Sequence, residues 1–163
     1  MSQRQKISNP FEGKVRVRVC GLLIENGEIL LLRHDTIGSA GYLWSPPGGG
    51  VDFGKGLAET LIQEFLEETS LHIEVDEYLF ANEFISERLH AIEHFFLVHR
   101  KSGNLKLGSD PELEENEQIL KEAKFFSQPE LDLLPADTIH SVFNAAKTRD
   151  KIAELRGLVT FKH

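Results

Sequence analysis

The chain has 163 residues, a length that fits one domain with a single hydrophobic core. Hydrophobic residues make up 40% of it and charged residues 27%, as in soluble globular proteins, which excludes extended disorder and fibrous repeats. The formal net charge of -8 argues against a nucleic-acid binder, which normally presents a basic face to phosphates. If an acidic protein acts on a polyanion, bound cations must screen its site, as in a divalent-metal enzyme.

The N-terminus and the single cysteine bear on where the protein works. Residues 1–10 are polar and lack the apolar core of a signal peptide, and no apolar run approaches the roughly 20 residues of a membrane span. Cys20 lies in the apolar run 19–24, so we expect a buried, unreactive thiol. A cytoplasmic protein with no membrane partner is therefore expected.

The first elements in the chain are expected to be a hairpin and a long irregular segment. Residues 15–25 alternate apolar with basic and then become continuously apolar, which predicts a strand that enters a covered sheet. Asn26-Gly27 is a two-residue hairpin signal, and residues 29–32 are the predicted partner strand. Residues 35–54 are rich in Gly, Ser and Pro, and long irregular segments of this kind are often functional.

A helix is predicted over residues 57–69, which contain neither Gly nor Pro, with Gly56 as its N-cap. Apolar residues recur at helical spacing within it and predict one buried face. The residues of this expected face are Ala58, Leu61, Ile62 and Phe65.

The second half of the chain reads first as strands and then as helices. Strands are predicted over 72–75, 78–85, 90–99 and 123–126, and helical structure from Pro129 and over most of 139–158. The acidic stretch 109–117 reads as a solvated loop. Because no repeat or linker divides the chain, we expect a single α+β or α/β layered domain over residues 1–163.

Three carboxylates are expected to share one face of the helix. Glu64, Glu67 and Glu68 stand at i, i+3 and i+4, so their like charges repel unless water or a cation surrounds them. Hard oxygen ligands on one face suit Mg²⁺ or Mn²⁺. Glutamate-rich faces are common, but the preceding Pro46–Gly50 loop can bring bare backbone close to the same point.

These residues resemble the Nudix box, whose pattern is G-x5-E-x7-R-E-U-x-E-E-x-G-U, with U a bulky aliphatic residue. Residues 49–71 keep its spacing, and residues 43–49 and the strand end Leu32-Arg33-His34 are also similar to members of this family. The resemblance covers residues 15–126. It implies a Nudix-type α/β/α sandwich with a mixed central sheet.

Three box positions depart from the pattern. Lys55 stands in place of the first glutamate, Gln63 in place of the arginine and Ser70 in place of the glycine that ends the helix. The first two departures are linked if the usual acid and arginine pair, because replacing only one would strand a charge. Lys55 could instead pair with Glu59 at i+4. A left-handed Ser70 would cost on the order of 1 kcal/mol.

The resemblance also implies roles for individual residues. Glu64, Glu67 and Glu68 would coordinate Mg²⁺, or Mn²⁺, together with a backbone carbonyl of Gly48 or Gly49, and the box glutamates would carry catalysis. Substrate contacts are expected from the following residues: Arg33, Gly49 and Gly50. For Arg33 the alternative is a surface salt bridge.

A general base is still needed in this scheme. It would be a box glutamate or a glutamate of a later loop, for which Glu115, Glu117 and Glu122 are the local candidates. We favour Glu117, although loop carboxylates of this kind are often only solvated charges.

The expected function is Mg²⁺-dependent hydrolysis of a diphosphate linkage in a nucleoside diphosphate joined to another moiety, either ADP-ribose-like or a modified nucleotide. The alternative is a nucleotide-binding or regulatory Nudix-fold module with weak or no turnover, which Lys55 and Gln63 would allow. In either case the partner is a small nucleotide and not a nucleic acid, and a homodimer is common among proteins that this chain resembles.

Overall fold

A computed structural model describes residues 11–109 and 115–162 of the chain. Within this part, eight strands form one mixed sheet, and the chain also contains two α-helices and three short 3-10 helices. The strands are β1 Val15–Glu25, β2 Glu28–Asp35, β3 Tyr42–Ser45, β4 Gly48–Gly50, β5 His72–Ile85, β6 His90–Ser102, β7 Leu120–Phe126 and β8 Gly157–Lys162. The helices are α1 Leu57–Thr69, η1 Glu115–Glu117, α2 Gln128–Leu133, η2 Ser141–Asn144 and η3 Arg149–Glu154.

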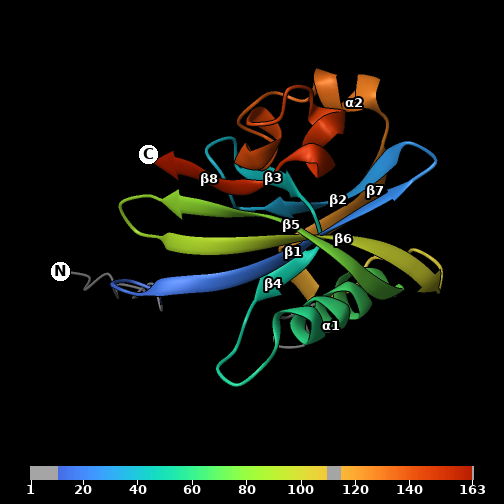
Figure 1. Cartoon of the computed structure of the whole chain (residues 1–163), viewed down its shortest axis with the longest axis horizontal. Coiled ribbons are helices and arrows are strands. Elements are labelled where there is room, and N and C mark those ends of the chain that lie inside the picture. Colours follow the sequence, from blue (N-terminus) through green and yellow to red (C-terminus); the bar gives the residue numbers. More distant parts are fainter. Residues whose placement is uncertain (1–10, 110–114, 163) are drawn as a thin grey trace.

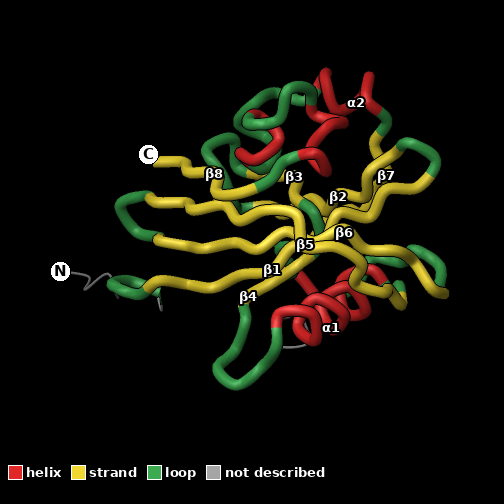
Figure 2. The backbone as a smooth tube through the Cα atoms, in the orientation of Figure 1, coloured by secondary structure: helices red, strands yellow, loops and turns green. Residues whose placement is uncertain are grey.

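The sheet lies between two helical layers. Neighbouring strands follow the order β3-β2-β1-β6-β5-β8, while β4 pairs with β1 and β7 pairs with β2. Figure 1 shows α1 on one side of the sheet and α2 with η2 and η3 on the other. The tube in Figure 2 shows the same three layers, with strands through the middle. The predicted mixed sheet in an α/β/α arrangement is confirmed.

Strand β1 lies inside the sheet and pairs with three other strands, β2, β4 and β6. It has the predicted bounds, and it turns into β2 through Asn26 and Gly27, whose φ angles of 52° and 79° are those of a tight hairpin turn. One edge of β1 pairs in parallel with β6, and the other pairs antiparallel with β4 at Arg18–Cys20. This second pairing places the glycine loop beside α1.

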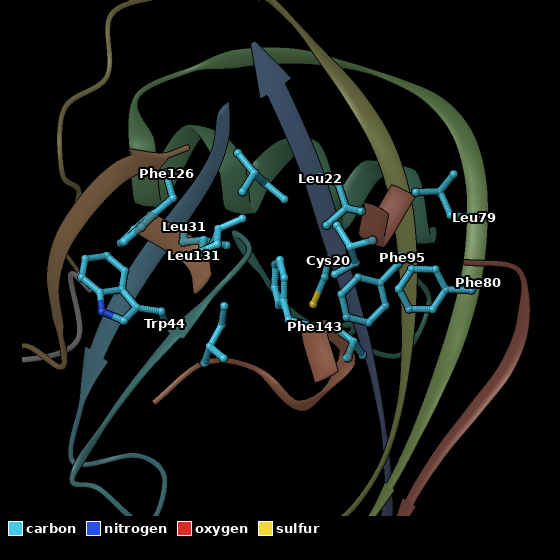
Figure 3. Close-up of a cluster of buried hydrophobic side chains, with 14 residues drawn as sticks. Cys20, Leu22, Leu31, Trp44, Leu79, Phe80, Phe95, Phe126, Leu131 and Phe143 are labelled. Atoms are coloured by element: carbon cyan, nitrogen blue, oxygen red, sulfur yellow. The ribbon is translucent and has the colours of Figure 1, made fainter. Parts of the chain in front are cut away.

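Two apolar clusters hold the layers together. Beneath the sheet, Leu61 and Phe65 of α1 pack against Val19 and Leu23 of β1, and all four side chains are at most 1% exposed. The larger cluster lies on the other side and joins the sheet to α2, η2 and η3 (Figure 3). Its labelled residues include Cys20, Trp44, Phe80, Phe95, Phe126 and Phe143.

Cys20 is buried in the larger cluster, as expected. Burial raises the pKa of its thiol, and Glu93 raises it further, so the thiolate is disfavoured. Among the described residues, no helix combines the length and the apolar character that a membrane crossing needs.

Two predictions of local structure were wrong. Residues 35–54 contain β3 and β4, which pair with β2 and β1 and so obtain hydrogen-bond partners that the local sequence does not reveal. Residues 139–158 form η2, η3 and the start of β8 rather than a long helix. Short turns let Ile139, Phe143 and Ile152 all reach the larger core cluster, and this packing overrides helix propensity.

Helix α1 has the predicted bounds but only part of the predicted buried face. Leu61 and Phe65 are fully buried, whereas Ala58 is exposed and Ile62 is 42% exposed. The buried positions in their place are Thr60 and Thr69, whose hydroxyls donate to the Gly56 and Phe65 carbonyls and so stay satisfied away from water. This rotation turns the glutamate side of the helix towards β4.

Candidate active site

Both ends of α1 are fixed by backbone contacts. Gly56 has extended dihedrals as the N-cap, and its N–H donates to Glu59 Oε2 at 3.4 Å. At the other end Ser70 adopts the left-handed conformation, with φ 59°, and its N–H donates to the Leu66 carbonyl. The Gly108 N–H donates to the Glu68 carbonyl at 2.8 Å, so the segment after β6 closes over the helix end.

A cleft of about 480 Å³ lies along the glutamate face of α1. On one side it is bounded by the helix and by the β4–α1 loop, and on the other by residues of β2, of β7 and of the segments that follow β2 and precede β7. The lining residues are His34, Ile37, Gly50, Asp52, Lys55, Thr60, Gln63, Glu64, Glu67, Glu68, Ser109, Gln118, Ile119 and Leu120.

The glycine loop and the box carboxylates meet in this cleft. The Gly48 N–H donates to Glu68 Oε2 at 3.0 Å. A Cβ atom on Gly49 would lie 2.8 Å from Glu64 Oε2 and closer still to Oε1, so only glycine leaves room for this carboxylate. Gly50 lines the cleft directly. The structure therefore brings together the glycine and glutamate residues that the sequence predicts for the site.

The electrostatics of the cleft favour a bound cation. Burial raises the pKa of Glu68 to about 8, and Glu64 and Glu67 add to this, against the Gly48 hydrogen bond. Burial and the charge of Glu67 also raise the pKa of Glu64, whereas Arg18 opposes the shift. These carboxylates are crowded and undercompensated, which is the state that a divalent cation relieves.

Carboxylates of α1 are the residues of the cleft that could hold a divalent cation. Among the described residues, no three His, Cys, Asp or Glu side chains are grouped closely enough to hold a metal ion by themselves. Mg²⁺ keeps several waters and commonly takes one or two carboxylates plus substrate phosphates. Glu64, Glu67 and Glu68 line one cleft wall and could supply such partial coordination.

Lys55 and Gln63, the two departures from the box, contact each other. Lys55 Nζ donates to Gln63 Oε1 at 3.3 Å, and Gln63 Nε2 donates to Glu67 Oε1 at 2.7 Å. Lys55 also lies 3.4 Å from Asp52 Oδ2. The expected pairing of Lys55 with Glu59 was wrong, because Glu59 caps the helix instead.

Arg33 does not line the cleft. Its Nε donates to Asp35 Oδ1 at 3.0 Å, and its guanidinium lies 4.6 Å from the centre of the Tyr42 ring. This salt bridge is the alternative role that the sequence left open for Arg33. A phosphate contact would require Arg33 to leave it.

The three later glutamates also stand outside the lining. Glu115 and Glu117 belong to η1 and are exposed, and Glu117 directly precedes the lining residue Gln118. Glu122 is exposed on β7, opposite Arg33 of β2. Residues 110–114 of the acidic stretch lie outside the described residues, so the expected loop is described only in part.

His34 is a cleft residue to which the sequence assigned no role. Burial lowers the pKa of its imidazole to about 4, and the positive charges of Arg18 and His140 lower it further. At neutral pH it therefore presents an uncharged ring. Ile37 and Ile119 line the same region from irregular segments. No local pattern marks these residues, because the cleft forms only when β2, β7 and α1 come together.

The sequence matches the NUDIX domain family over residues 14–145, which is most of the chain. The chain therefore belongs to the Nudix family. Its glycine loop and glutamate helix occupy one cleft, and the enzyme class of the family is that of the Nudix hydrolases. No curated protein matches the sequence.

Solved structures share the fold. An ADP-ribose pyrophosphatase from Streptococcus suis has 20% identity and a TM-score of 0.59, with 88% of this chain and 98% of that chain covered. A MutT protein from Methanosarcina mazei Go1 has 21% identity and a TM-score of 0.64, covering 86% and 91%. A UDP-X diphosphatase has 18% identity and a TM-score of 0.61, covering 92% and 70%. At these identities the likeness shows the fold.

Proposed function

We propose that this Nudix hydrolase cleaves the diphosphate linkage of a nucleoside diphosphate joined to another moiety, with Mg²⁺ or Mn²⁺ as cofactor. The observation that carries the proposal is the packing of Glu64 and Glu68 against the Gly48–Gly50 loop, at a place where burial raises the pKa of both carboxyl groups. Such a site gains most from a ligand that brings a divalent cation and phosphate oxygens together.

The metal would be held by Glu64, Glu67 and Glu68, with the Gly48 carbonyl as a backbone ligand. When bound, Mg²⁺ supplies charge neutralisation on the diphosphate and lowers the pKa of a coordinated water. The protein itself fixes Glu68 through the Gly48 N–H and Glu67 through Gln63. We also propose Glu117 as the base, because it adjoins the cleft through Gln118.

The other wall of the cleft suits the uncharged part of such a substrate. His34 presents a neutral ring there, beside Ile37 and Ile119. A nucleoside can pack against this wall while its diphosphate faces the carboxylates. The names of two similar structures, an ADP-ribose pyrophosphatase and a UDP-X diphosphatase, suggest where a substrate panel should start.

The test is turnover of ADP-ribose, UDP-sugars, dinucleoside polyphosphates and oxidised nucleoside triphosphates by the purified protein with Mg²⁺. We expect at least one of them to release a nucleoside monophosphate, and chromatography detects this product. Glu67→Gln should reduce kcat by about 100-fold or more if the carboxylate acts in the transition state. Glu59→Gln is the matched control, because Glu59 is on the same helix but caps Gly56 outside the cleft. Ligand binding without turnover on the whole panel would refute hydrolysis and favour a binding module.

A further inference from the structure

We propose that Lys55 is a positioning residue, which acts through the Gln63 amide to fix the Glu67 carboxylate in the cleft. The inference rests on the proposed function in one respect, because it takes Glu67 as a carboxylate that faces the metal. It concerns the two positions at which the chain departs from the family pattern.

The three side chains form a directed series of hydrogen bonds. Lys55 Nζ donates to Gln63 Oε1 at 3.3 Å, and Gln63 Nε2 donates to Glu67 Oε1 at 2.7 Å. An ammonium group only donates, so it holds the amide oxygen on its own side. The amide NH₂ must then point towards Glu67, whose carboxylate only accepts. The charge of Lys55 therefore selects which end of the amide Glu67 meets.

Glu67 needs such support more than its neighbours do. Glu68 is held by the Gly48 N–H, and Glu64 is confined against Gly49. Glu67 lies on the exposed side of α1, where a glutamate side chain samples several rotamers. A hydrogen bond from Gln63 limits this freedom, and groups that orient metal-facing ligands commonly matter for affinity and rate.

The same geometry explains why both departures occur together. The family pattern has an acid at position 55 and an arginine at position 63, so the acid can hold the guanidinium while that group donates onward. In this chain a cation at 55 holds an amide, which also donates onward. The polarity of the first contact is reversed, but a donor still faces Glu67. A single reversion should therefore break the series, and a double reversion should restore it.

The competing explanation is that Lys55 only stabilises the start of α1 through Asp52, which it approaches to 3.4 Å at i,i+3. Exposed pairs of this kind contribute little to stability. That explanation predicts an effect on unfolding alone. The proposal predicts an effect on metal affinity, with little change in unfolding.

The experiment is a double-mutant cycle of Lys55→Glu, Gln63→Arg and the double variant. Calorimetry measures the Kd for Mn²⁺ without substrate, and denaturation measures stability. Lys55→Glu should turn the amide round and present its oxygen to Glu67, weakening Mn²⁺ binding by about tenfold or more. Gln63→Arg alone places two cations together and should also weaken it. The double variant should bind within about threefold of the natural chain.

Lys147→Glu makes the same charge change at an exposed position outside the cleft and should leave the Kd unchanged. Additive effects in the cycle, or lower stability with unchanged Mn²⁺ affinity, would overturn the positioning role. A natural chain that binds no Mn²⁺ would also overturn it. Failure of the proposed hydrolysis looks different: Mn²⁺ binding would follow the cycle while no member of the substrate panel is turned over.

Discussion

Gly49 lies so close to the Glu64 carboxylate that a side chain at position 49 would displace this carboxylate. A Cβ atom on Gly49 would stand 2.8 Å from Glu64 Oε2, a distance shorter than real Cβ atoms show, and nearer still to Oε1. The Glu64 carboxylate is thus packed directly on bare backbone. The glycine at this position serves the placement of a carboxylate and not the turning of the chain.

Gly49→Ala should therefore damage the site more than the fold. The new methyl group must push the Glu64 side chain away, and misplacement of a site group by about 1 Å can cost about 100-fold in rate. We expect kcat/KM to fall at least about tenfold, and the Kd for Mn²⁺ to rise. Gly56→Ala is the control, since its Cβ would meet nothing closer than Glu59 Cβ at 4.0 Å. Equal activity of the two variants would contradict this account.

The metal-free protein should lose stability as the pH rises. The pKa of Glu68 is about 8 in the folded chain, against an ordinary value of 4.5. Between these values the folded state holds a proton that the unfolded state has released, so the stabilisation is complete below pH 4.5 and is lost as pH approaches 8. The free energy of unfolding, measured by urea at pH 5 and 8, should fall more for the natural chain than for Glu68→Gln. A pH dependence that is the same in both proteins would exclude Glu68 as its source.

The elements with strong local signals could be predicted from the sequence. Strand β1 and helix α1 have the predicted bounds, because the apolar run, the Asn26-Gly27 turn and the N-cap at Gly56 each act within a few residues. The convergence of the glycine loop and the box glutamates was also predictable, since both lie within one short segment. The spacing of these residues in the sequence is enough to predict that they meet in one site.

The features that depend on long-range contacts could not be predicted. Residues 139–158 have helical composition, but the core above the sheet selects short turns. His34 enters the cleft only because β2 lies opposite α1, and Arg33 has its partner two residues away. The buried face of α1 includes Thr60 and Thr69 instead of Ala58 and Ile62, because the glutamate side of the helix faces β4. Each outcome is set by a neighbour that is distant in the sequence.

Glu93 is a buried charge that ties three strands to the segment before η2. It is 6% exposed and accepts hydrogen bonds from Asn82 Nδ2 at 2.8 Å and from the His140 ring, 3.1 Å from its Oε2. Arg18 Nε lies 3.5 Å from Oε1. Burial opposes ionisation, but His140 and Arg18 outweigh it and hold the pKa of Glu93 at about 2.

Removal of the Glu93 carboxylate should be costly because it leaves Arg18 without its buried counter-charge. We expect Glu93→Ala to lower the free energy of unfolding by about 3–5 kcal/mol. Glu93→Gln keeps the shape and one acceptor, so its cost should be smaller. Chemical denaturation at pH 7 measures both variants. If neither variant lowers the free energy of unfolding, the charge of Glu93 is not what the surrounding groups require.

Ser70→Gly should stabilise the protein, since the backbone at this position has φ 59° and ψ 19°. A side chain in the left-handed region costs about 1 kcal/mol, and glycine removes that cost while adding some freedom to the unfolded chain. The net gain should be about 0.5 kcal/mol, or a Tm higher by about 1–2 °C. Ser102→Gly, the same change in the extended backbone of β6, should lower the Tm instead. Since Ser70 does not line the cleft, kcat should not change. A lower Tm for Ser70→Gly would mean that the serine side chain stabilises the helix end by more than its backbone conformation costs.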